Sequence, residues 1–492
     1  MTKSDAPLIV GVSGLRGIVG ESLTPEVAVR FAGAFGGWLR ETRGYARVVV
    51  GHDGRAGGEV IYSAAKSALM WSGIEVVEAG RCTTPGLATA VDSTDADGGL
   101  MVTASHNPQP WNGLKLMTNE PYEERGGACA PPKRIADEII ARFAEGETAW
   151  VAWHELGEAT IVDDVNESHA RSVWYATDPS IDDGDSEDRP QHHVMLDSVN
   201  CGGGESAGAM LRMLGHRATQ LFGDDSGRFP HTPEPTAENL SGEGGLCDAV
   251  PGLKADVGFA QDPDADRLAI VDENGRYIGE EYTLVIAAEA LLSARERSDE
   301  KPVMVVNLST SRMIEDVAAK HGAEVVRTPV GEANVVERMK ALMEEGREVI
   351  LGGEGNGGVI WPEVCFVRDS LSAMALTLSS MARTGKTVSE IVALIDSYSE
   401  GGKGYAIVKR KTEIASKADA KPACDKVEKA YASERVDTQD GVRVDFSGAR
   451  AGCWVHVRAS NTEPIMRLIC EAPTEGLANE ILAEVEGVIA GG

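Results

Sequence analysis

The chain has 492 residues, a formal net charge of -30 and a pI of about 4.8, and 42% of its residues are hydrophobic. This length exceeds what one hydrophobic core supports and predicts about three or four domains. The acidic charge disfavours nucleic acid and anionic membranes as partners, and no run of about 18 apolar residues predicts a membrane span. The N-terminus lacks the pattern of a signal peptide, so we expect a cytoplasmic protein. The eight cysteines have no paired spacing, which predicts free thiols.

The N-terminal region alternates apolar strands with helical stretches, the pattern of a parallel sheet with helical crossovers. Residues 8–20, LIVGVSGLRGIVG, predict a strand followed by a glycine-rich loop that carries Arg16. Glycines let backbone N–H groups approach an anion, and an arginine suits phosphate oxygens, although a plain strand turn fits the same residues. A helix is expected to begin with Thr24 as its cap and Pro25 at its first position, and to run to Trp38.

The hexapeptide TASHNP, residues 103–108, follows the apolar run 99–102 and ends at a proline, which predicts a strand that leads into a tight loop. Such a loop places Ser105 at the carboxyl end of a parallel strand, where open α/β sheets carry their chemistry. An ordinary polar turn is the alternative interpretation. Lys115 follows on a segment that returns to extended structure, and by itself it fits an exposed lysine of a hairpin.

Three carboxylates at alternate positions mark the stretch ADVGFAQDPDADRLAIVD, residues 255–272. Two apolar strands are expected to flank a loop that carries Asp262, Asp264 and Asp266. Each pair of such charges at roughly 4 Å costs about 4 kcal/mol at an effective dielectric of about 20, and a divalent cation relieves that cost. The loop lacks the glycine and glutamate of an EF-hand, so we expect Mg²⁺, with a solvated acidic turn as the alternative.

The sequence on either side of this loop predicts further strands and helices. An acidic stretch at 178–190 is expected to be a solvated loop, and a helix is expected at 280–294. The segment 346–363 predicts a strand that leads into a glycine-rich loop with Glu354 and Asn356. That loop fits the close approach of a polyhydroxylated ligand, and it fits a sharp interdomain turn equally well.

The last hundred residues predict a hairpin-rich region that ends in an amphipathic helix at 475–489. Residues 454–472 predict two strands joined by a loop of hydrogen-bond donors, with no compensating acid until Glu463. Such a loop is chemically suited to hold a phosphate. The donors are Arg458, Ser460, Asn461 and Thr462.

With the motifs TASHNP, DPDADR, GEGNGG and RASNTEP in this order, the chain resembles the α-D-phosphohexomutase superfamily, which includes phosphoglucomutase, phosphomannomutase and phosphoglucosamine mutase. The resemblance covers nearly the whole chain. It implies an α/β fold of four domains around a central cleft, three of related topology and a smaller C-terminal α+β domain. The expected divisions are a phosphoserine domain at 1–160, a metal-binding domain at 161–272, a sugar-binding domain at 273–395 and a phosphate-binding domain at 396–492.

The resemblance implies an isomerase that interconverts 6-phospho and 1-phospho hexoses or hexosamines through a phosphoserine and a bisphosphorylated sugar, which also serves as activator. Ser105 would carry the phosphoryl group, and a phosphate oxygen on it would bind Mg²⁺ together with the three aspartates. Arg16 and Lys115 would assist proton transfer and charge stabilisation. Arg267 would contact phosphate or sugar.

The sugar loop and the C-terminal loop complete the implied site. Glu354 and Asn356 would bind sugar hydroxyls, whereas the donor loop that begins at Arg458 would hold the phosphate that is not reacting. Many members of the superfamily have Ser-Gly-His after the sugar-loop glutamate. Here the residues are Asn356-Gly357-Gly358, and the histidine is absent.

The choice of substrate stays open between several sugars. GGEGNGG, EPTAENL and QDPDADR look most like the archaeal-type phosphoglucosamine mutase branch, and a phosphomannomutase or phosphoglucomutase of broad hexose specificity is the alternative. An alternative of a different class is a Mg²⁺-dependent sugar-phosphate phosphohydrolase with Asp262 as covalent nucleophile. A non-catalytic binder would need a broken motif, and none of the proposed catalytic residues is missing.

Overall fold

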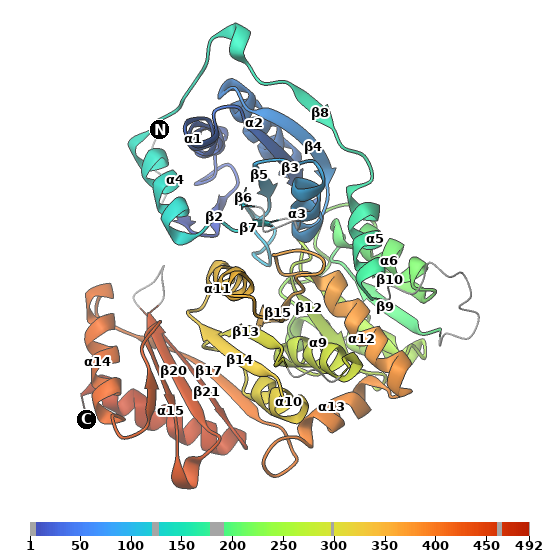
Figure 1. The fold of residues 1–492 in the computed structure, drawn as a ribbon, viewed down its shortest axis with the longest axis vertical. Helices are drawn as coiled ribbons and strands as arrows, with labels where there is room; N and C mark the ends of the chain where they lie inside the picture. Colours follow the sequence, from blue (N-terminus) through green and yellow to red (C-terminus); the bar gives the residue numbers. More distant parts are fainter. Residues whose placement is uncertain (1–5, 121–126, 178–190, 297–299, 460–464, 492) are drawn as a thin grey trace.

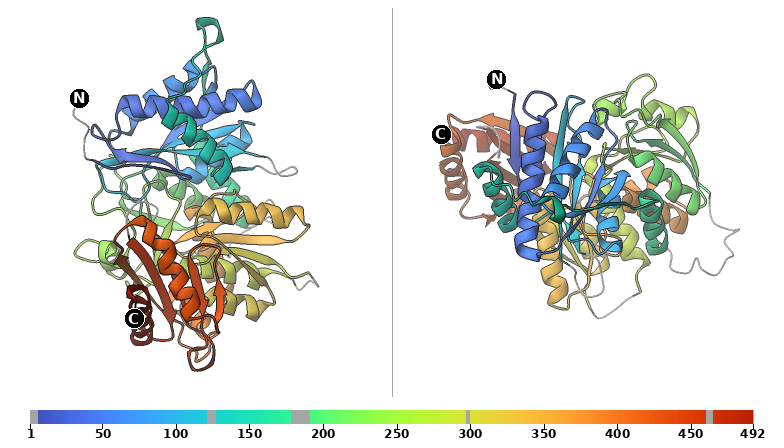
Figure 2. Two further views of the ribbon diagram at one scale, coloured as in Figure 1. Left: turned by 90° about the vertical axis from the view of Figure 1, so that its left-hand side faces the viewer. Right: turned by 90° about the horizontal axis from the view of Figure 1, so that it is seen from above.

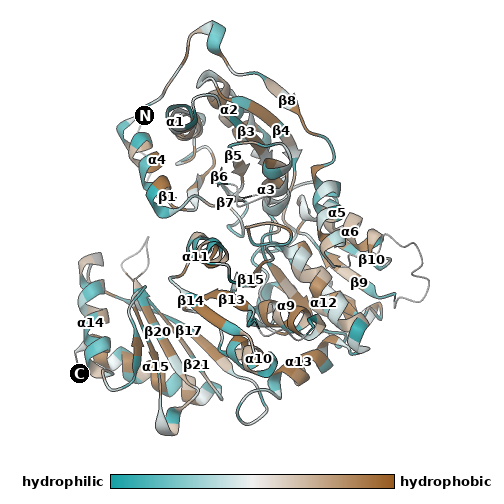
Figure 3. Cartoon of the chain, in the orientation of Figure 1, coloured by the Kyte–Doolittle hydropathy of each residue, from teal (hydrophilic) through white to brown (hydrophobic). Residues whose placement is uncertain are grey.

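The computed structural model describes residues 6–120, 127–177, 191–296, 300–459 and 465–491, which form four sheets in succession. Figure 1 shows these sheets along an arc that runs from the N-terminal sheet at the top, through the green and yellow regions, to the C-terminal sheet at the lower left; Figure 2 shows two further views. In Figure 3 the apolar residues concentrate on the strands and on the helix faces that pack on them. No helix in these ranges is long and apolar enough to cross a membrane. All eight cysteines are free, as predicted.

The N-terminal sheet has the strand order β1-β2-β6-β5-β3-β4-β8, with β7 beside β6. Strands β5, β3, β4 and β8 are parallel, and β6 returns antiparallel to β5. The strands are β1 (Leu8–Gly11), β2 (Gly14–Ile18), β3 (Arg47–His52), β4 (Glu75–Arg81), β5 (Gly98–Val102), β6 (Trp111–Asn119), β7 (Ala128–Cys129) and β8 (Ala159–Ile161). The helices are α1 (Pro25–Arg43), α2 (Gly58–Trp71), α3 (Thr84–Ser93) and α4 (Lys133–Glu145), followed by the 3-10 turn η1 (Trp153–Glu155).

The second sheet has the order β10-β9-β11-β12, and only β12 is antiparallel. Its strands are β9 (His193–Asp197), β10 (Arg217–Phe222), β11 (Val257–Gln261) and β12 (Leu268–Val271). Its helices are α5 (Val165–Thr177), α6 (Gly203–Met213), α7 (Ala237–Leu240) and α8 (Leu246–Gly252).

The third sheet repeats this arrangement as β14-β13-β15-β16, again with an antiparallel last strand. Its strands are β13 (Val303–Asn307), β14 (Glu324–Thr328), β15 (Val349–Glu354) and β16 (Gly358–Ile360). Its helices are α9 (Glu280–Ala294), α10 (Met313–His321), α11 (Glu332–Glu344), α12 (Ser370–Thr384) and α13 (Val388–Asp396). One hydrophobic core, with residues from α5, α6, α9 and α12, joins this layer to the second sheet.

A shared topology places the three predicted site loops at equivalent points. The order β4-β3-β5-β6 in the first sheet matches β10-β9-β11-β12 and β14-β13-β15-β16. In each sheet the chain leaves the third parallel strand, turns, and returns as the antiparallel fourth strand. The Ser105 loop follows β5, the aspartate loop follows β11, and the sugar loop that begins at Glu354 follows β15. The expectation of three related α/β domains is therefore confirmed.

The C-terminal sheet is wholly antiparallel, in the order β17-β21-β20-β19-β18. It lacks the crossover pattern of the others, as expected for an α+β domain. Its strands are β17 (Ala406–Glu413), β18 (Arg435–Asp437), β19 (Val442–Asp445), β20 (Trp454–Ala459) and β21 (Ile465–Ala472). The helices α14 (Ala420–Ala430) and α15 (Glu475–Ala490) accompany the 3-10 turns η3 (Lys417–Asp419) and η4 (Gly448–Arg450).

Two local predictions near the N-terminus need correction. Arg16 lies in strand β2, not in a loop, because Gly14–Ile18 pairs with β6, where Arg16 is opposite Gly113. The helix that begins at Pro25 has the predicted Thr24 cap but continues past Trp38 to Arg43, since no helix-breaking residue occurs before Gly44. The acidic stretch 178–190 lies outside the described residues.

Candidate active site

Ser105 lies on a tightly held loop after β5. Its side chain is buried, and its backbone has a φ of 50°, a left-handed conformation that non-glycine residues rarely adopt and that often marks functional sites. The carbonyl oxygen of Ser105 accepts a hydrogen bond of 2.5 Å from Arg55 Nη2, and its N–H donates to Thr103 Oγ1 over 2.9 Å. Asp53 accepts from both Thr103 Oγ1 and Arg55 Nε, at 2.6 and 2.9 Å. These bonds fix the direction in which the serine points.

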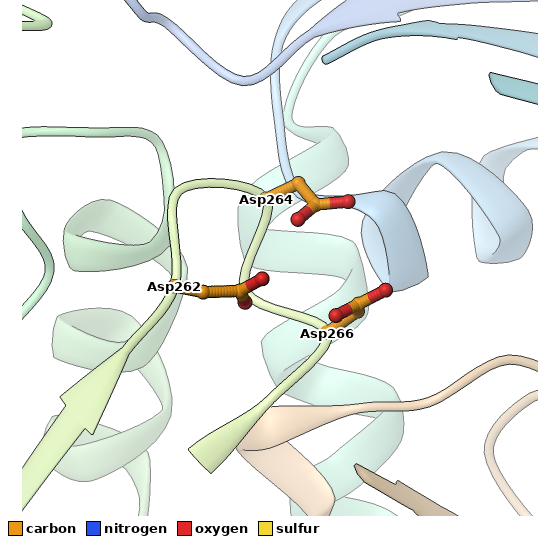
Figure 4. A group of neighbouring side chains, drawn as sticks. All are labelled: Asp262, Asp264 and Asp266. Carbon is orange, nitrogen blue, oxygen red and sulfur yellow. The ribbon is translucent and has the colours of Figure 1, made fainter. Parts of the chain in front are cut away.

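The three aspartates of the second sheet form one cluster. Their carboxyl groups extend to the same side of the loop between β11 and β12 (Figure 4), and one oxygen of each lies within 4.8 Å of the others. All three are buried. Asp264 Oδ1 and Asp266 Oδ1 are buried and have no hydrogen-bond partner within the described ranges. Carboxylate oxygens of this kind fit the preference of Mg²⁺ for hard ligands.

The serine loop and the aspartate loop meet although they come from different sheets. Ser105 Oγ donates a hydrogen bond of 2.8 Å to Asp262 Oδ2. Thr84, at the start of α3, donates from Oγ1 to Asp264 Oδ2 over 2.6 Å. A hydroxyl and three carboxylates, more than 150 residues apart in sequence, thus lie at one point.

Two buried cations partly neutralise the aspartates. Lys115 Nζ lies 3.2 Å from Asp264 Oδ2 and 2.8 Å from Asp266 Oδ2, and Arg368 Nη2 lies 2.7 Å from the same oxygen of Asp266. Lys115 is therefore a buried site residue and not the exposed lysine of a hairpin. Burial opposes its charge, but Asp266 and Asp264 outweigh burial and raise its pKa.

The aspartates themselves differ in how easily they ionise. Burial, with a smaller effect from Asp266 and Asp264, raises the pKa of Asp262 well above its usual range. Burial also opposes the charge on Asp266, but Arg368 and Lys115 outweigh it and hold the pKa of Asp266 well below its usual range. The three carboxylates therefore carry more negative charge than Lys115 and Arg368 neutralise. Among the described residues, Asp262 forms an ion pair with neither of these two cations.

Arg16 and Arg267 add positive charge at the edge of this cluster. Arg16 Nη1 donates to Asn107 Oδ1, in the serine loop, over 3.0 Å. Burial lowers the pKa of Arg16, although Asp264 and Asp266 oppose the shift. Arg267 Nε is buried without a hydrogen-bond partner among the described residues, and it lies 3.9 Å from Asp266 Oδ1.

The sugar-loop residues are placed beside the cluster by β15. Glu354 is buried and accepts from Asn307 Nδ2 over 2.8 Å, from the N–H of Gly331 over 3.1 Å and from Arg368 Nη1 over 2.8 Å. Asn356 is only partly exposed, and its Oδ1 has no partner within the described ranges. Arg368 therefore connects Glu354 to the aspartate loop.

The C-terminal loop differs from its prediction at two points. Arg458 lies in strand β20, opposite Arg467 of β21, and not in the loop. Arg458 has a compensating acid, since its Nε lies 3.2 Å from Asp440 Oδ2 on the neighbouring hairpin. That acid lies 18 positions earlier in the sequence, so the pair could not be anticipated from the donor loop alone. Ser460, Asn461 and Thr462 lie outside the described residues.

Sequence reasoning missed three buried residues of this site. Arg368 follows the apolar run 364–367 after β16, and its role depends on contacts with distant segments. Asp53 and Arg55 support the Ser105 loop from the end of β3. The only available signal for these two was their position: Asp-Gly-Arg directly follows a buried strand, as the other site loops do.

A buried carboxyl under the sugar loop predicts a pH effect on stability. Glu281, at the start of α9, accepts from the N–H of Ser311 over 2.9 Å and lies against Gly355. Burial raises its pKa to about 8, although Lys409 opposes the shift and Glu280 and Glu471 add to it. Between about pH 4.5 and 8, Glu281 therefore keeps a proton in the folded protein that it has released in the unfolded chain. The free energy of unfolding accordingly falls as the pH rises through this range.

We expect Glu281→Gln, which keeps a hydrogen-bond acceptor without the charge, to flatten this part of the pH dependence. Thermal unfolding of the variant and the parent at pH 6.5 and pH 9 measures it, with Glu337→Gln, at an exposed position of α11, as control. A fall in Tm between the two pH values that is as large in Glu281→Gln as in the parent contradicts the prediction.

Four sheets, the first three of which bring a buried serine, three carboxylates and several cations to one point, define a four-domain α/β enzyme of the phosphohexomutase type. The sequence matches the descriptions "Phosphoglucomutase/phosphomannomutase, alpha/beta/alpha" domain I at residues 7–149, domain II at 175–275 and domain III at 279–398, and the C-terminal domain at 408–488. The chain belongs to the phosphoglucomutase/phosphomannomutase family, and its activity is that of a phosphohexomutase.

Known relatives match along their full length. A "Phosphoglucomutase/phosphomannomutase" of Thermococcus kodakarensis is 35% identical over 484 residues, which cover 96% of each chain. A "Probable phosphoglucosamine mutase" of Methanopyrus kandleri is 33% identical over 488 residues, or 97% of each chain. A crystal structure of a phosphoglucomutase/phosphomannomutase family protein from Burkholderia thailandensis has the same fold, with a TM-score of 0.77, 24% identity and 98% of each chain covered.

Proposed function

We propose that the chain is a phosphoglucosamine mutase that carries its phosphoryl group on Ser105. The observation that carries the proposal is the hydrogen bond of 2.8 Å from Ser105 Oγ to Asp262, inside a buried carboxylate cluster. The hydroxyl of an unmodified Ser105 donates a hydrogen bond to the Asp262 carboxylate. When Ser105 is phosphorylated, that proton is gone and the phosphate needs a cation between itself and the aspartates.

Mg²⁺ fits that position. Asp262, Asp264 and Asp266 would hold it together with a phosphate oxygen on Ser105, and the unpartnered Oδ1 atoms of two of these aspartates are available to it. When bound, the ion neutralises charge and polarises the phosphoryl oxygens. Lys115 and Arg368, which already pair with Asp266, keep that carboxylate ionised and oriented.

The chain's own residues supply the rest of the chemistry. A sugar hydroxyl oxygen forms a bond to phosphorus as the bond from phosphorus to Ser105 Oγ breaks. The proton that the sugar hydroxyl loses is matched by the proton that Ser105 Oγ gains. Arg16 and Lys115, both cationic at the edge of the aspartate cluster, are our candidates to pass this proton between the two oxygens and to stabilise the charge on the transferring group. The resulting bisphosphorylated sugar reorients in the site and transfers its other phosphoryl group to Ser105.

Further groups would hold the sugar phosphate while it reacts. Arg267 would contact phosphate or sugar, and Glu354 and Asn356 would bind sugar hydroxyls. The donor loop from Arg458 to Thr462 would hold the phosphate that is not reacting, and a hexose bisphosphate would act as activator by phosphorylating Ser105. We keep 1–160, 161–272, 273–395 and 396–492 as the proposed domain division.

The identity of the sugar is tested by direct comparison. Values of kcat/KM are measured on glucosamine 6-phosphate, glucose 1-phosphate and mannose 1-phosphate, each with Mg²⁺ and the matching bisphosphate. We expect glucosamine 6-phosphate to be preferred by at least about tenfold, a difference of about 1.4 kcal/mol in transition-state binding. Equal values would instead assign the chain to the mutases of broad hexose specificity, as the name of the Thermococcus kodakarensis relative would suggest.

A further inference from the structure

Arg368 is the point at which the aspartate loop and the sugar loop are joined. Its guanidinium is buried and pairs with carboxylates from three separate segments. Nη2 lies 2.7 Å from Asp266 Oδ2, Nη1 lies 2.8 Å from Glu354 Oε2, and Nε lies 3.1 Å from Glu332 Oε2 at the start of α11. The contacts to Asp266 and Glu354 are hydrogen bonds, and the contact to Glu332 is an ion pair without hydrogen-bond geometry. A planar guanidinium presents its donors to two carboxylates in a fixed fork, whereas the compact ammonium of lysine does not.

The backbone that carries Arg368 is also fixed. The next residue, Asp369, caps α12 by accepting from the N–H groups of Leu371 and Ser372. The N–H of Asp369 donates to the carbonyl of Val359 over 2.7 Å, which ties the segment to β16. These bonds fix the backbone beside Arg368, so its side chain starts from one defined point next to β16.

Gly358 shows how closely the arginine arm is packed. A Cβ added to Gly358 would lie 2.2 Å from Arg368 Cδ and 2.9 Å from its Cγ. The φ of Gly358 is not in the positive range, so its backbone does not itself require glycine. Because three ion pairs hold the arm in place, any side chain at 358 must displace Arg368. Gly358 stands where many members of the superfamily have the sugar-loop histidine. The side chain of Arg368 occupies the space that a side chain at this position would need, which explains the glycine.

We propose that Arg368 is a positioning residue that fixes Glu354 and Asp266 relative to each other, so that the sugar bound by Glu354 is aligned with the phosphoryl group beside Asp266. We further propose that residue 358 is glycine because a larger side chain would occupy the space of the Arg368 side chain. This inference deepens the proposed function and rests on it. Loss of an outer partner of this kind costs about 10- to 100-fold in activity. We expect Arg368→Ala to lose this much in kcat/KM, with KM raised through Glu354 and kcat lowered through Asp266, and Arg368→Lys to restore neither.

A double-mutant cycle with Gly358 tests the arrangement. Gly358→Ala in the parent should displace Arg368 and lose activity to a similar degree, whereas Gly358→Ala in the Arg368→Ala protein should cost little more. Residues in contact show such non-additivity, while independent ones add. Additive losses, rescue by Arg368→Lys, or unchanged kcat and KM in Arg368→Ala would each overturn the proposal.

A matched control separates positioning from stability. Arg410 is a half-buried arginine of β17 that pairs with Glu486 of α15 at 2.8 Å, within the C-terminal domain. Arg410→Gln should lower Tm but leave the kinetic constants of the parent. The Tm values of the Gly358 and Arg368 variants form a second cycle that needs no turnover. If the parent shows no mutase activity, the proposed function fails, and the Tm cycle alone still supports or contradicts the contact between Arg368 and Gly358.

Discussion

Replacement of Ser105 by alanine is expected to abolish mutase turnover, with a loss of at least about 10³-fold in kcat, since removing a residue that bonds covalently to the transferred group removes the pathway itself. The substitution removes only the hydroxyl that donates to Asp262, while Arg55 and Thr103 bond to the backbone of residue 105 and are retained. The loop should therefore keep its shape. A coupled assay of the 1-phosphate and 6-phosphate interconversion measures the effect.

Ser172→Ala is the matched control, because this half-buried serine lies in α5 and its Oγ donates to the carbonyl of Ser168, one turn earlier in the helix. It should keep the activity of the parent. Inorganic phosphate release is followed in the same samples, since a phosphohydrolase that used Asp262 as nucleophile would release phosphate and would keep working without Ser105. Wild-type mutase turnover in Ser105→Ala would refute a phosphoryl carrier at this position.

Removal of the divalent ion is expected to have the second largest effect. Exhaustive chelation should reduce kcat/KM by at least about 100-fold, because an ion at such a site supplies several kcal/mol of charge stabilisation to phosphoryl transfer. Asp262→Asn should make the same activity depend on much higher Mg²⁺, since Asp262 forms no ion pair within the described ranges and faces Ser105. Titration of Mg²⁺ against turnover, and of Mn²⁺ against the apoprotein by calorimetry, measures both changes.

Asp272→Asn serves as the control for this experiment. Asp272 is buried in the same sheet and pairs with Arg276 at 3.1 Å, so its loss tests general damage to the domain. It should leave the Mg²⁺ dependence unchanged. Full activity after chelation, or an unaltered Mg²⁺ titration in Asp262→Asn, would contradict the assignment of the three aspartates.

The fold was predictable from the sequence where patterns are local. The apolar run 99–102 lies in the buried strand β5, the two strands expected beside the aspartate loop are β11 and β12, and the helix expected at 280–294 has those bounds. The three loops were found because each follows such a strand. The three loops occupy equivalent places because the three sheets share one strand order. Strand order depends on pairing between distant segments, so no single stretch of the sequence predicts it.

The site was predictable as a set of polar loops but not as a charge network. From the sequence, Lys115 fits an exposed lysine of a hairpin. In the structure, β6 is an interior strand of the sheet, and the Lys115 side chain is buried against the aspartates. Arg368 has no local signal at all, since its three partners come from α11 and from the loops after β11 and β15. Conversely, Arg458 seemed unpaired only because Asp440 lies on another strand pair.

The most direct test of the central claim is the mass of the peptide that contains Ser105. The protein is incubated with a hexose 1,6-bisphosphate, digested and analysed by mass spectrometry, before and after an excess of the sugar monophosphate is added. We expect one phosphoryl group on Ser105 after the bisphosphate and its loss to the sugar monophosphate. An unmodified Ser105 in a protein that still turns over, or a phosphoryl group on a different residue, would contradict the account.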